Sequence, residues 1–291
     1  MATVARVEPV LHPNPAPSAL AVSNTRAREL FYKEDISSCI SPKTRALLES
    51  NGIPPDDVIR HVHEVRDKAW AIRPYPCIGY GLYLNPALPQ HPAYDTVLRR
   101  IHDGAICLEI GSFMGSDLRV LAADGAPAEN LIATDLVNFW EVGYEMYRDR
   151  ACFPTRFVQA DLLKADSLQE FHHSIDIILL SKVLHTFDIE GQVAACRHLV
   201  ELSRPNTLIV GDQQGCGTAH EAKVDPNRPG IWMHDEASWR VMWERVGRET
   251  DTRWEVATTA KTLAELGWDP RDWPFLRAGA MLLQFSVRRT E

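Results

Sequence analysis

The chain has 291 residues, of which 45% are hydrophobic, and its formal net charge at pH 7 is −8. This size suits a large buried core in one enlarged domain, or in one domain with an extension. The sequence has no basic tract, which excludes nucleic acid and anionic membrane surfaces as main partners. It also has no apolar run of membrane-spanning length and no apolar signal core, so we expect a cytoplasmic protein with reduced cysteines.

The first hundred residues divide into two parts. Residues 1–28 are rich in Ala, Pro, Val and Ser without apolar periodicity, which predicts a flexible tail. Residues 29–100 have a mixed, mainly helical pattern, and Ser41-Pro42 is typical of a helix cap followed by a first-turn proline. We therefore predict an N-terminal helical cap extension over residues 29–100.

Prolines and glycines interrupt this extension at residues 73–83, where Tyr75, Tyr80 and Tyr83 make the segment aromatic. Because these prolines and glycines disfavour regular helix, we expect a structured loop. The loop either covers a pocket, with the three tyrosines as substrate contacts, or packs the extension onto the main domain. The sequence leaves both interpretations open.

From residue 101 to residue 291 the pattern predicts a single α/β domain. Strands are predicted for the apolar stretches at residues 106–110, 131–134, 157–160, 175–180 and 207–211. Helical stretches alternate with them. Such alternation is typical of a parallel sheet covered on both faces. A helix capped at Asp235 and ended at Gly247 follows, with Trp239 and Trp243 assigned to the core. Strands at 254–258 and 280–287 complete a Rossmann-like, seven-stranded sheet whose last strand is antiparallel, the outline of a class I methyltransferase.

The first predicted strand has Glu109 next to its last residue and leads through Gly111 and Gly115 into a helix. This strand–turn–helix unit brings a ligand close to the backbone in doubly wound α/β domains. The next two strands lead into Asp135 and Asp161, so an acidic residue lies at the end of each of three successive strands. Together these features indicate S-adenosylmethionine (SAM) and methyl transfer.

Each of these residues has an expected role toward SAM. The glycines leave room for the methionine part, Glu109 anchors its amino group, and Asp135 accepts hydrogen bonds from the ribose hydroxyls. Asp161 and the Leu162 backbone bind the adenine edge. The full set of predicted cofactor residues is Glu109, Gly111, Ser112, Gly115, Asp135, Leu136, Asp161, Leu162 and Ser181.

A nicotinamide enzyme is the main rival, and two observations count against it. Dinucleotide sites use G-x-G-x-x-G, whereas here the spacing is Gly111-x-x-x-Gly115, and Asp117 would repel a phosphate. The Tyr-x-x-x-Lys pair of short-chain reductases does not occur in the sequence.

Further segments resemble one family within this fold. They are Tyr75-Pro-Cys-Ile-Gly79, Gly115-Ser-Asp-Leu-Arg119, Ala123-Asp-Gly-Ala-Pro127, Gly143-Tyr144, Leu184-His185, Phe187-Asp188 and Asp235 through Trp243. From about residue 70 onward the chain is similar to fungal small-molecule methyltransferases, including carboxyl methyltransferases of meroterpenoid biosynthesis. The resemblance implies a SAM-dependent O-methyltransferase that acts on an apolar secondary-metabolite carboxylate or phenol.

His185 is the candidate catalytic residue. It follows the fourth strand, whose carboxyl end borders the ligand site in open α/β sheets. A histidine there can deprotonate a phenol or enol. The alternative is a partly buried histidine that holds its loop through a backbone hydrogen bond. We expect Asp188 to cap the following helix rather than to orient His185.

The predicted substrate wall combines the tyrosines of the aromatic loop with residues near the fifth strand, namely Gln213, Trp232, Met233 and His234. We predict no metal, because Asp212 alone offers too few hard ligands. Two alternatives stay open, a methyltransferase-fold cyclase or isomerase and a SAM-binding protein without catalysis. A homodimer is also left open.

Overall fold

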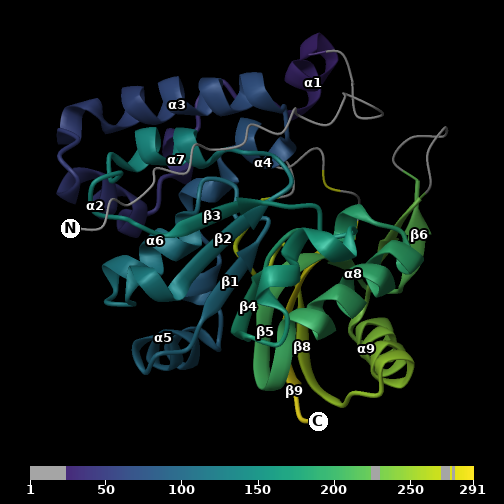
Figure 1. Cartoon of the computed structure of the whole chain (residues 1–291). Coiled ribbons are helices and arrows are strands. Elements are labelled where there is room, and N and C mark those ends of the chain that lie inside the picture. Colours follow the sequence, from purple (N-terminus) through teal and green to yellow (C-terminus); the bar gives the residue numbers. More distant parts are fainter. Residues whose placement is uncertain (1–23, 224–229, 270–275, 277–278) are drawn as a thin grey trace, which may run out of the picture.

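A seven-stranded sheet forms the centre of the molecule, in the order β3-β2-β1-β4-β5-β9-β8 (Figure 1). Its strands are β1 (Cys107–Ile110), β2 (Leu131–Asp135), β3 (Arg156–Gln159), β4 (Ile175–Leu180), β5 (Ser203–Cys216), β8 (Trp254–Thr262) and β9 (Ala280–Arg289). Strands β1 to β5 pair in parallel, and β9 runs antiparallel to β5 and to β8. The predicted class I methyltransferase sheet, with its antiparallel last strand, is confirmed.

The computed structural model describes residues 24–223, 230–269, 276 and 279–291. Its helices are α1 (Asn24–Phe31), α2 (Pro42–Ser50), α3 (Val58–Ile72), α4 (Pro76–Gly79), α5 (Tyr94–His102), α6 (Ser116–Ala123), α7 (Trp140–Tyr147), α8 (Ile189–Leu202) and α9 (Glu236–Thr250). Within the described ranges, no helix is both long and apolar enough to cross a membrane. Residues 1–23 of the predicted tail lie outside the described residues. The tail's predicted last residues belong to α1, where Ala27 is buried.

Side chains on the two faces of the sheet enter separate cores because successive strand residues point to opposite faces. On one face Leu108 and Ile178 pack with α8 and α9, including Trp239 and Trp243. The predicted assignment of this tryptophan stripe to the core is confirmed. The other face packs against α5 and α6.

The N-terminal extension has a third core, which it shares with α7. Apolar side chains of α2 and α3 pack there with Phe139 and Met146. In Figure 1, α3 lies along the edge of the molecule nearest β3, with α7 beneath it. The extension is thus attached to the domain by buried apolar contacts.

Two predicted helix caps are present, and one predicted helix end is wrong. The Ser41 hydroxyl accepts a hydrogen bond from the Thr44 backbone N–H at 3.1 Å, and the Asp235 carboxylate accepts one from Ser238 at 2.8 Å. Helix α9 continues past Gly247 to Thr250. Gly247 instead allows the backbone at Thr252 to pack closely against α9, since a Cβ at Gly247 would lie 2.6 Å from the Thr252 carbonyl oxygen.

The aromatic loop contains more helix than predicted. Pro76 occupies the first position of α4, where its missing N–H costs nothing, and the Tyr80 N–H closes the turn on the Pro76 carbonyl at 3.0 Å. The prolines and glycines therefore limit the helix to a single turn rather than exclude it.

Strand β5 is longer than predicted because β9 pairs with it from Leu208 to Cys216. Beyond it, β6 (His220–Ala222) and β7 (Ile231–Met233) form an antiparallel pair that the sequence did not predict. Strands of three residues are too short to show the alternation by which strands are recognised.

Candidate active site

The carboxyl ends of the central strands lie at one edge of the sheet. Glu109 in β1 is level with Ala133 in β2 and with Leu179 in β4. The predicted residues at or just after the ends of these strands, including Gly111, Asp135 and Ser181, are thereby brought together. Ligands of open α/β sheets bind at this edge.

The loop between β1 and α6 is held by left-handed residues and by bonds to β2. Gly111 and Gly115 have φ values of 74° and 67°, and Phe113 between them has φ 51°. The N–H groups of Gly111 and Ser112 donate to the Thr134 carbonyl at 2.9 and 3.0 Å. The loop therefore keeps a fixed shape at the end of β1.

The glycines have a packing role beside the predicted one. A Cβ on Gly111 would lie 2.5 Å from Val183, and a Cβ on Gly115 would lie 2.6 Å from Trp140. At each glycine the position of a Cβ is therefore occupied by a protein side chain, so the absence of a Cβ serves backbone conformation and packing. The predicted room for the methionine part of SAM stays a prediction.

Asp135 fastens this loop. One carboxylate oxygen accepts the Phe113 N–H at 2.8 Å, and the other accepts the Val137 N–H at 2.9 Å. Burial raises the pKa of Asp135 above its ordinary value, and these two N–H groups oppose the rise. Each oxygen keeps a lone pair for a further donor.

Glu109 lies beneath the loop with an oxygen, Oε2, that is buried and has no hydrogen-bond partner. Burial raises its pKa well above the ordinary value, and the nearby charges of Asp117 and Asp135 add to this. Burial also raises the pKa of Asp117 to about 6. The edge therefore holds one buried carboxyl group, that of Glu109, and two half-buried ones, and a cation would stabilise them in their ionised form.

Arg119 supports the site from behind. Its guanidinium donates to the Asp149 carboxylate from Nε at 2.5 Å and from Nη2 at 3.0 Å, and also donates to the Met114 carbonyl. It is 2% exposed and packs against aromatic rings, including that of Trp140 at 5.1 Å. This pair, which the sequence did not predict, ties the glycine loop to the end of α7.

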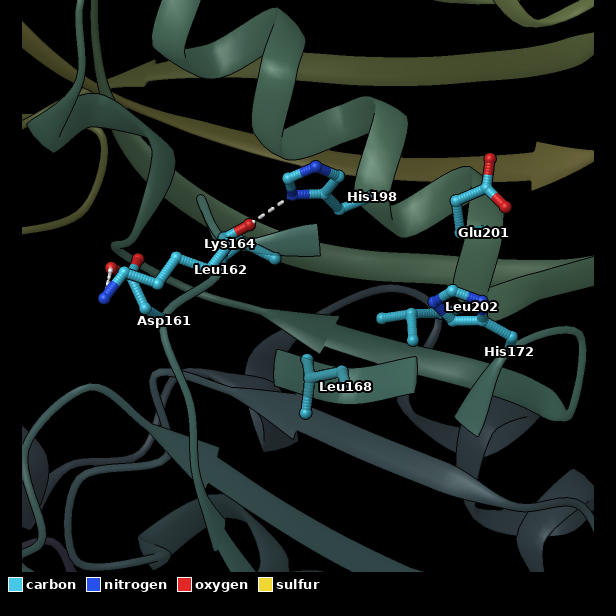
Figure 2. A pocket seen from close by; sticks show the side chains of 8 residues that line it. All are labelled: Asp161, Leu162, Lys164, Leu168, His172, His198, Glu201 and Leu202. Carbon is cyan, nitrogen blue, oxygen red and sulfur yellow. Dashed lines mark hydrogen bonds and ion pairs between the residues drawn. The ribbon is translucent and has the colours of Figure 1, made fainter. Parts of the chain in front are cut away.

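The predicted adenine-binding residues lie farther along the edge. Asp161 accepts the Leu163 N–H at 3.0 Å, and the Leu162 carbonyl accepts a hydrogen bond from His198 Nδ1 at 2.6 Å. Leu136 is exposed, whereas the Leu162 side chain is buried. Figure 2 shows a hollow near Asp161 and α8, lined by Asp161, Leu162, Lys164, Leu168, His172, His198, Glu201 and Leu202. No residue of the glycine loop, 111–115, lines this hollow.

His185 lies on a 3-10 turn, Leu184–Thr186, directly after β4. Its Nδ1 is buried without a hydrogen-bond partner, so the predicted alternative of a backbone bond is absent at that atom. Burial and the Lys182 charge lower the pKa of His185 to about 4, against the influence of Asp212. The ring is therefore neutral at neutral pH. Asp188 accepts the Gly191 N–H at 2.7 Å and caps α8, as predicted.

Lys182 is a site residue that sequence reasoning missed. Its φ is 57°, its backbone N–H donates to the Asp212 carbonyl at 2.7 Å, and its ammonium donates to the Asp212 carboxylate at 2.6 Å. A left-handed non-glycine residue is uncommon and marks a constrained site. In the sequence, only its position just after the predicted fourth strand indicates that Lys182 could belong to the site.

The predicted substrate residues separate into three groups. Gln213 and His234 are buried near the β6–β7 pair, and Trp232 is half-buried there with its indole N–H buried. Met233 packs instead with Cys216 and Ala222 in a small separate cluster, so its side chain is structural.

The tyrosines form the third group. The Tyr83 ring lies 5.1 Å from Phe113, and the Tyr75 ring lies 6.2 Å from Phe139. Tyr80 is buried as well. These contacts favour the interpretation in which the aromatic loop packs the extension onto the domain, and they place it against the glycine loop.

Two histidines that could suggest metal binding have structural partners. His61 bonds the Met146 carbonyl at 2.9 Å, and His63 bonds the Ile59 carbonyl at 2.8 Å. In the part of the chain that the structure describes, no group of three or more His, Cys, Asp or Glu side chains is placed to hold a metal.

The fold and the acidic edge are those of a class I methyltransferase. Residues 31–84 match the family model "Meroterpenoid methyltransferase N-terminal domain". The chain is 32% identical to the methyltransferase prhM of Penicillium brasilianum over 252 residues, which cover 84% of this chain and 90% of prhM. It is 36% identical to the O-methyltransferase atr3 of Stereocaulon alpinum over 225 residues, or 75% of this chain and 65% of atr3. The chain therefore belongs to this family of fungal methyltransferases and is an enzyme of that class.

A solved structure supports the fold independently of these sequences. The phosphoethanolamine N-methyltransferase 2 of Haemonchus contortus superposes with a TM-score of 0.52 over 78% of this chain and 60% of that chain, at 12% sequence identity. At this identity the likeness concerns the fold alone.

Proposed function

We propose that the protein uses SAM to methylate an oxygen of an apolar secondary metabolite, with a carboxylate as the acceptor. The observation that carries the cofactor proposal is the buried, partnerless Oε2 of Glu109 at the end of β1. The methyltransferases prhM and atr3 support the reaction class.

The residues at the sheet edge fit SAM chemically. SAM carries an ammonium and a sulfonium, and a buried carboxylate without a partner fits such a cation. Glu109 would hold the ammonium, and the free lone pairs of Asp135 would accept the ribose hydroxyls. When bound, SAM supplies an activated methyl group.

The acceptor proposal depends on the strength of His185 as a base. A phenol has a pKa near 10 and a carboxylic acid one near 4, so only the phenol is protonated at neutral pH. A histidine whose pKa is about 4 is a weak base for a phenol. An acceptor that is already ionised needs no base, which supports the carboxylate. The protein's contribution is then to position the oxygen and exclude water.

We expect the affinity for S-adenosylhomocysteine (SAH) to rise with pH between about 5 and 8. Burial raises the pKa values of Glu109 and Asp117 in the free protein, so both retain protons that binding of an ammonium releases. Glu109→Gln should weaken binding by about 1.5–3 kcal/mol and reduce the proton release. Calorimetry in buffers of different ionisation enthalpy measures both quantities. The exposed Asp103→Asn is the control, and affinity independent of pH in the wild type would count against the proposed role of Glu109.

We expect His185→Ala to lower turnover by less than about tenfold, because a carboxylate needs no general base, whose help is typically worth 10²–10⁴-fold. The rate should stay flat between about pH 5.5 and 9 in both proteins. Transfer of labelled methyl from saturating SAM measures it, with the exposed His102→Ala as the matched control. A loss above about a hundredfold in a folded variant would make His185 the base and the acceptor a phenol.

A further inference from the structure

A group of buried polar atoms near the end of β5 has no hydrogen-bond partners. The group comprises both side-chain polar atoms of Gln213, His234 Nε2 and the indole N–H of Trp232. Gln213 is 1% exposed and His234 is 0% exposed. Buried polar groups in folded proteins are nearly always paired, so several such atoms together indicate a missing partner.

These side chains come from neighbouring positions. Gln213 and Gly215 are two residues apart in β5 and so point to the same face. Gly215 pairs with His234, whose carbonyl accepts the Cys216 N–H at 2.9 Å. The His234 ring lies 6.3 Å from the Trp232 ring. Gln213 thus lies two residues along β5 from the residue that pairs with His234, and we call Gln213, Trp232 and His234 together the polar cluster.

The polar cluster adjoins the loop that carries His185. The Trp232 N–H donates to the Phe187 carbonyl at 2.9 Å. The Gln192 side-chain amide donates to the Trp232 carbonyl at 2.8 Å and to the Phe187 carbonyl at 3.2 Å. Strand β7 is thus bonded to the segment that follows β4, which places the cluster beside the turn that carries His185.

The polar cluster is uncharged. His234 Nδ1 bonds Ser238 Oγ at 2.9 Å, which leaves Nε2 for another partner. Burial lowers the pKa of His234 to about 4, so its ring is neutral at neutral pH. The Asp235 carboxylate, next to His234 in the chain, is occupied by the N–H groups of Ser238 and Ala219. An anion bound here would lack a counter-ion, whereas a hydroxyl or a ketone oxygen would match these donors and acceptors.

We propose that Gln213, Trp232 and His234 bind an uncharged oxygen of the acceptor, a hydroxyl or a ketone, distinct from the oxygen that is methylated. This inference rests on the proposed function, and it defines the substrate class as oxygenated acids with a second, neutral polar group. A site built to hydrogen-bond such a group discriminates strongly against analogues that lack it.

The test compares phenol with toluene, which differ by one hydroxyl, on the full chain saturated with SAH. The indole N–H signal of Trp232, assigned with Trp232→Phe, reports binding by nuclear magnetic resonance. We expect phenol to shift this signal at a concentration about tenfold lower than toluene, the effect of one buried hydrogen bond. Gln213→Leu should reduce the preference to less than about twofold without lowering the unfolding midpoint, because its amide has no partner to lose.

The neighbouring Gln214→Leu, on the opposite face of β5, is the matched control and should keep the preference. His234→Phe is a second variant with the same expectation as Gln213→Leu. The inference is overturned if neither probe shifts the signal, if both act equally, or if both variants retain the preference. SAH binding without a phenol preference refutes this inference alone. Failure of SAH to bind refutes the proposed cofactor. The preference for phenol over toluene is then measured on the protein without SAH, and its absence there overturns this inference.

Discussion

Replacing Arg119 by leucine is expected to lower the free energy of unfolding by about 3–5 kcal/mol. Both partners of the Arg119–Asp149 pair are nearly inaccessible, with side chains 1% and 5% exposed. Removal of the guanidinium would leave the Asp149 carboxylate buried and unpaired, and such a charge is costly in a low-dielectric interior. Urea unfolding of the wild type and the variant measures the difference.

Two further variants test the cause of this loss. Arg150→Leu removes an exposed pair with Glu141 and should change stability by less than about 1 kcal/mol. The double variant Arg119→Leu with Asp149→Leu should recover much of the loss, because it no longer buries an unpaired charge. If Arg119→Leu were as stable as Arg150→Leu, the buried Arg119–Asp149 pair would not be what stabilises the contact between the glycine loop and the end of α7.

Asp135→Ala is expected to weaken SAH binding by at least about 1.5–3 kcal/mol, the worth of one hydrogen bond to a charged group. The variant loses the proposed ribose acceptor. It also frees the N–H groups of Phe113 and Val137, which the carboxylate holds at 2.8 and 2.9 Å. Calorimetric titration with SAH measures the change.

Asp135→Asn separates these two contributions. Its amide oxygen can still accept one loop N–H, so it should retain more loop order than alanine does, although it has lost the charge. Circular dichroism and the unfolding midpoint establish that each variant is folded. Unchanged SAH affinity in a folded Asp135→Ala would remove Asp135 from the cofactor site.

The strands that position the site were predictable because each is a short apolar run beside a turn. Residues 175–180 coincide with β4, and the first strand differs from β1 by one residue at its start. Local composition determines such strands, since those at the centre of a parallel sheet are buried on both faces. The class of fold followed from their order along the chain.

Other features depend on contacts between distant residues, which a single sequence does not reveal. Lys182, which follows β4, contacts Asp212 in the neighbouring strand β5. Arg119 contacts Asp149, and the whole of α7 lies between these two residues in the chain. Gly111 and Gly115 were predicted to leave space for a ligand, and the sequence did not reveal that their missing side chains also accommodate Val183 and Trp140. In these cases the sequence shows the type of residue, but it does not show which distant residue that residue contacts.

Mass spectrometry of metabolite extracts incubated with the protein and methyl-labelled SAM tests the central proposal most directly. We predict one labelled methyl group on an oxygen of an oxygenated acid, released by mild alkaline hydrolysis because a methyl ester is base-labile. Label on carbon or nitrogen, or an acceptor isomerised without a gain in mass, would contradict O-methylation.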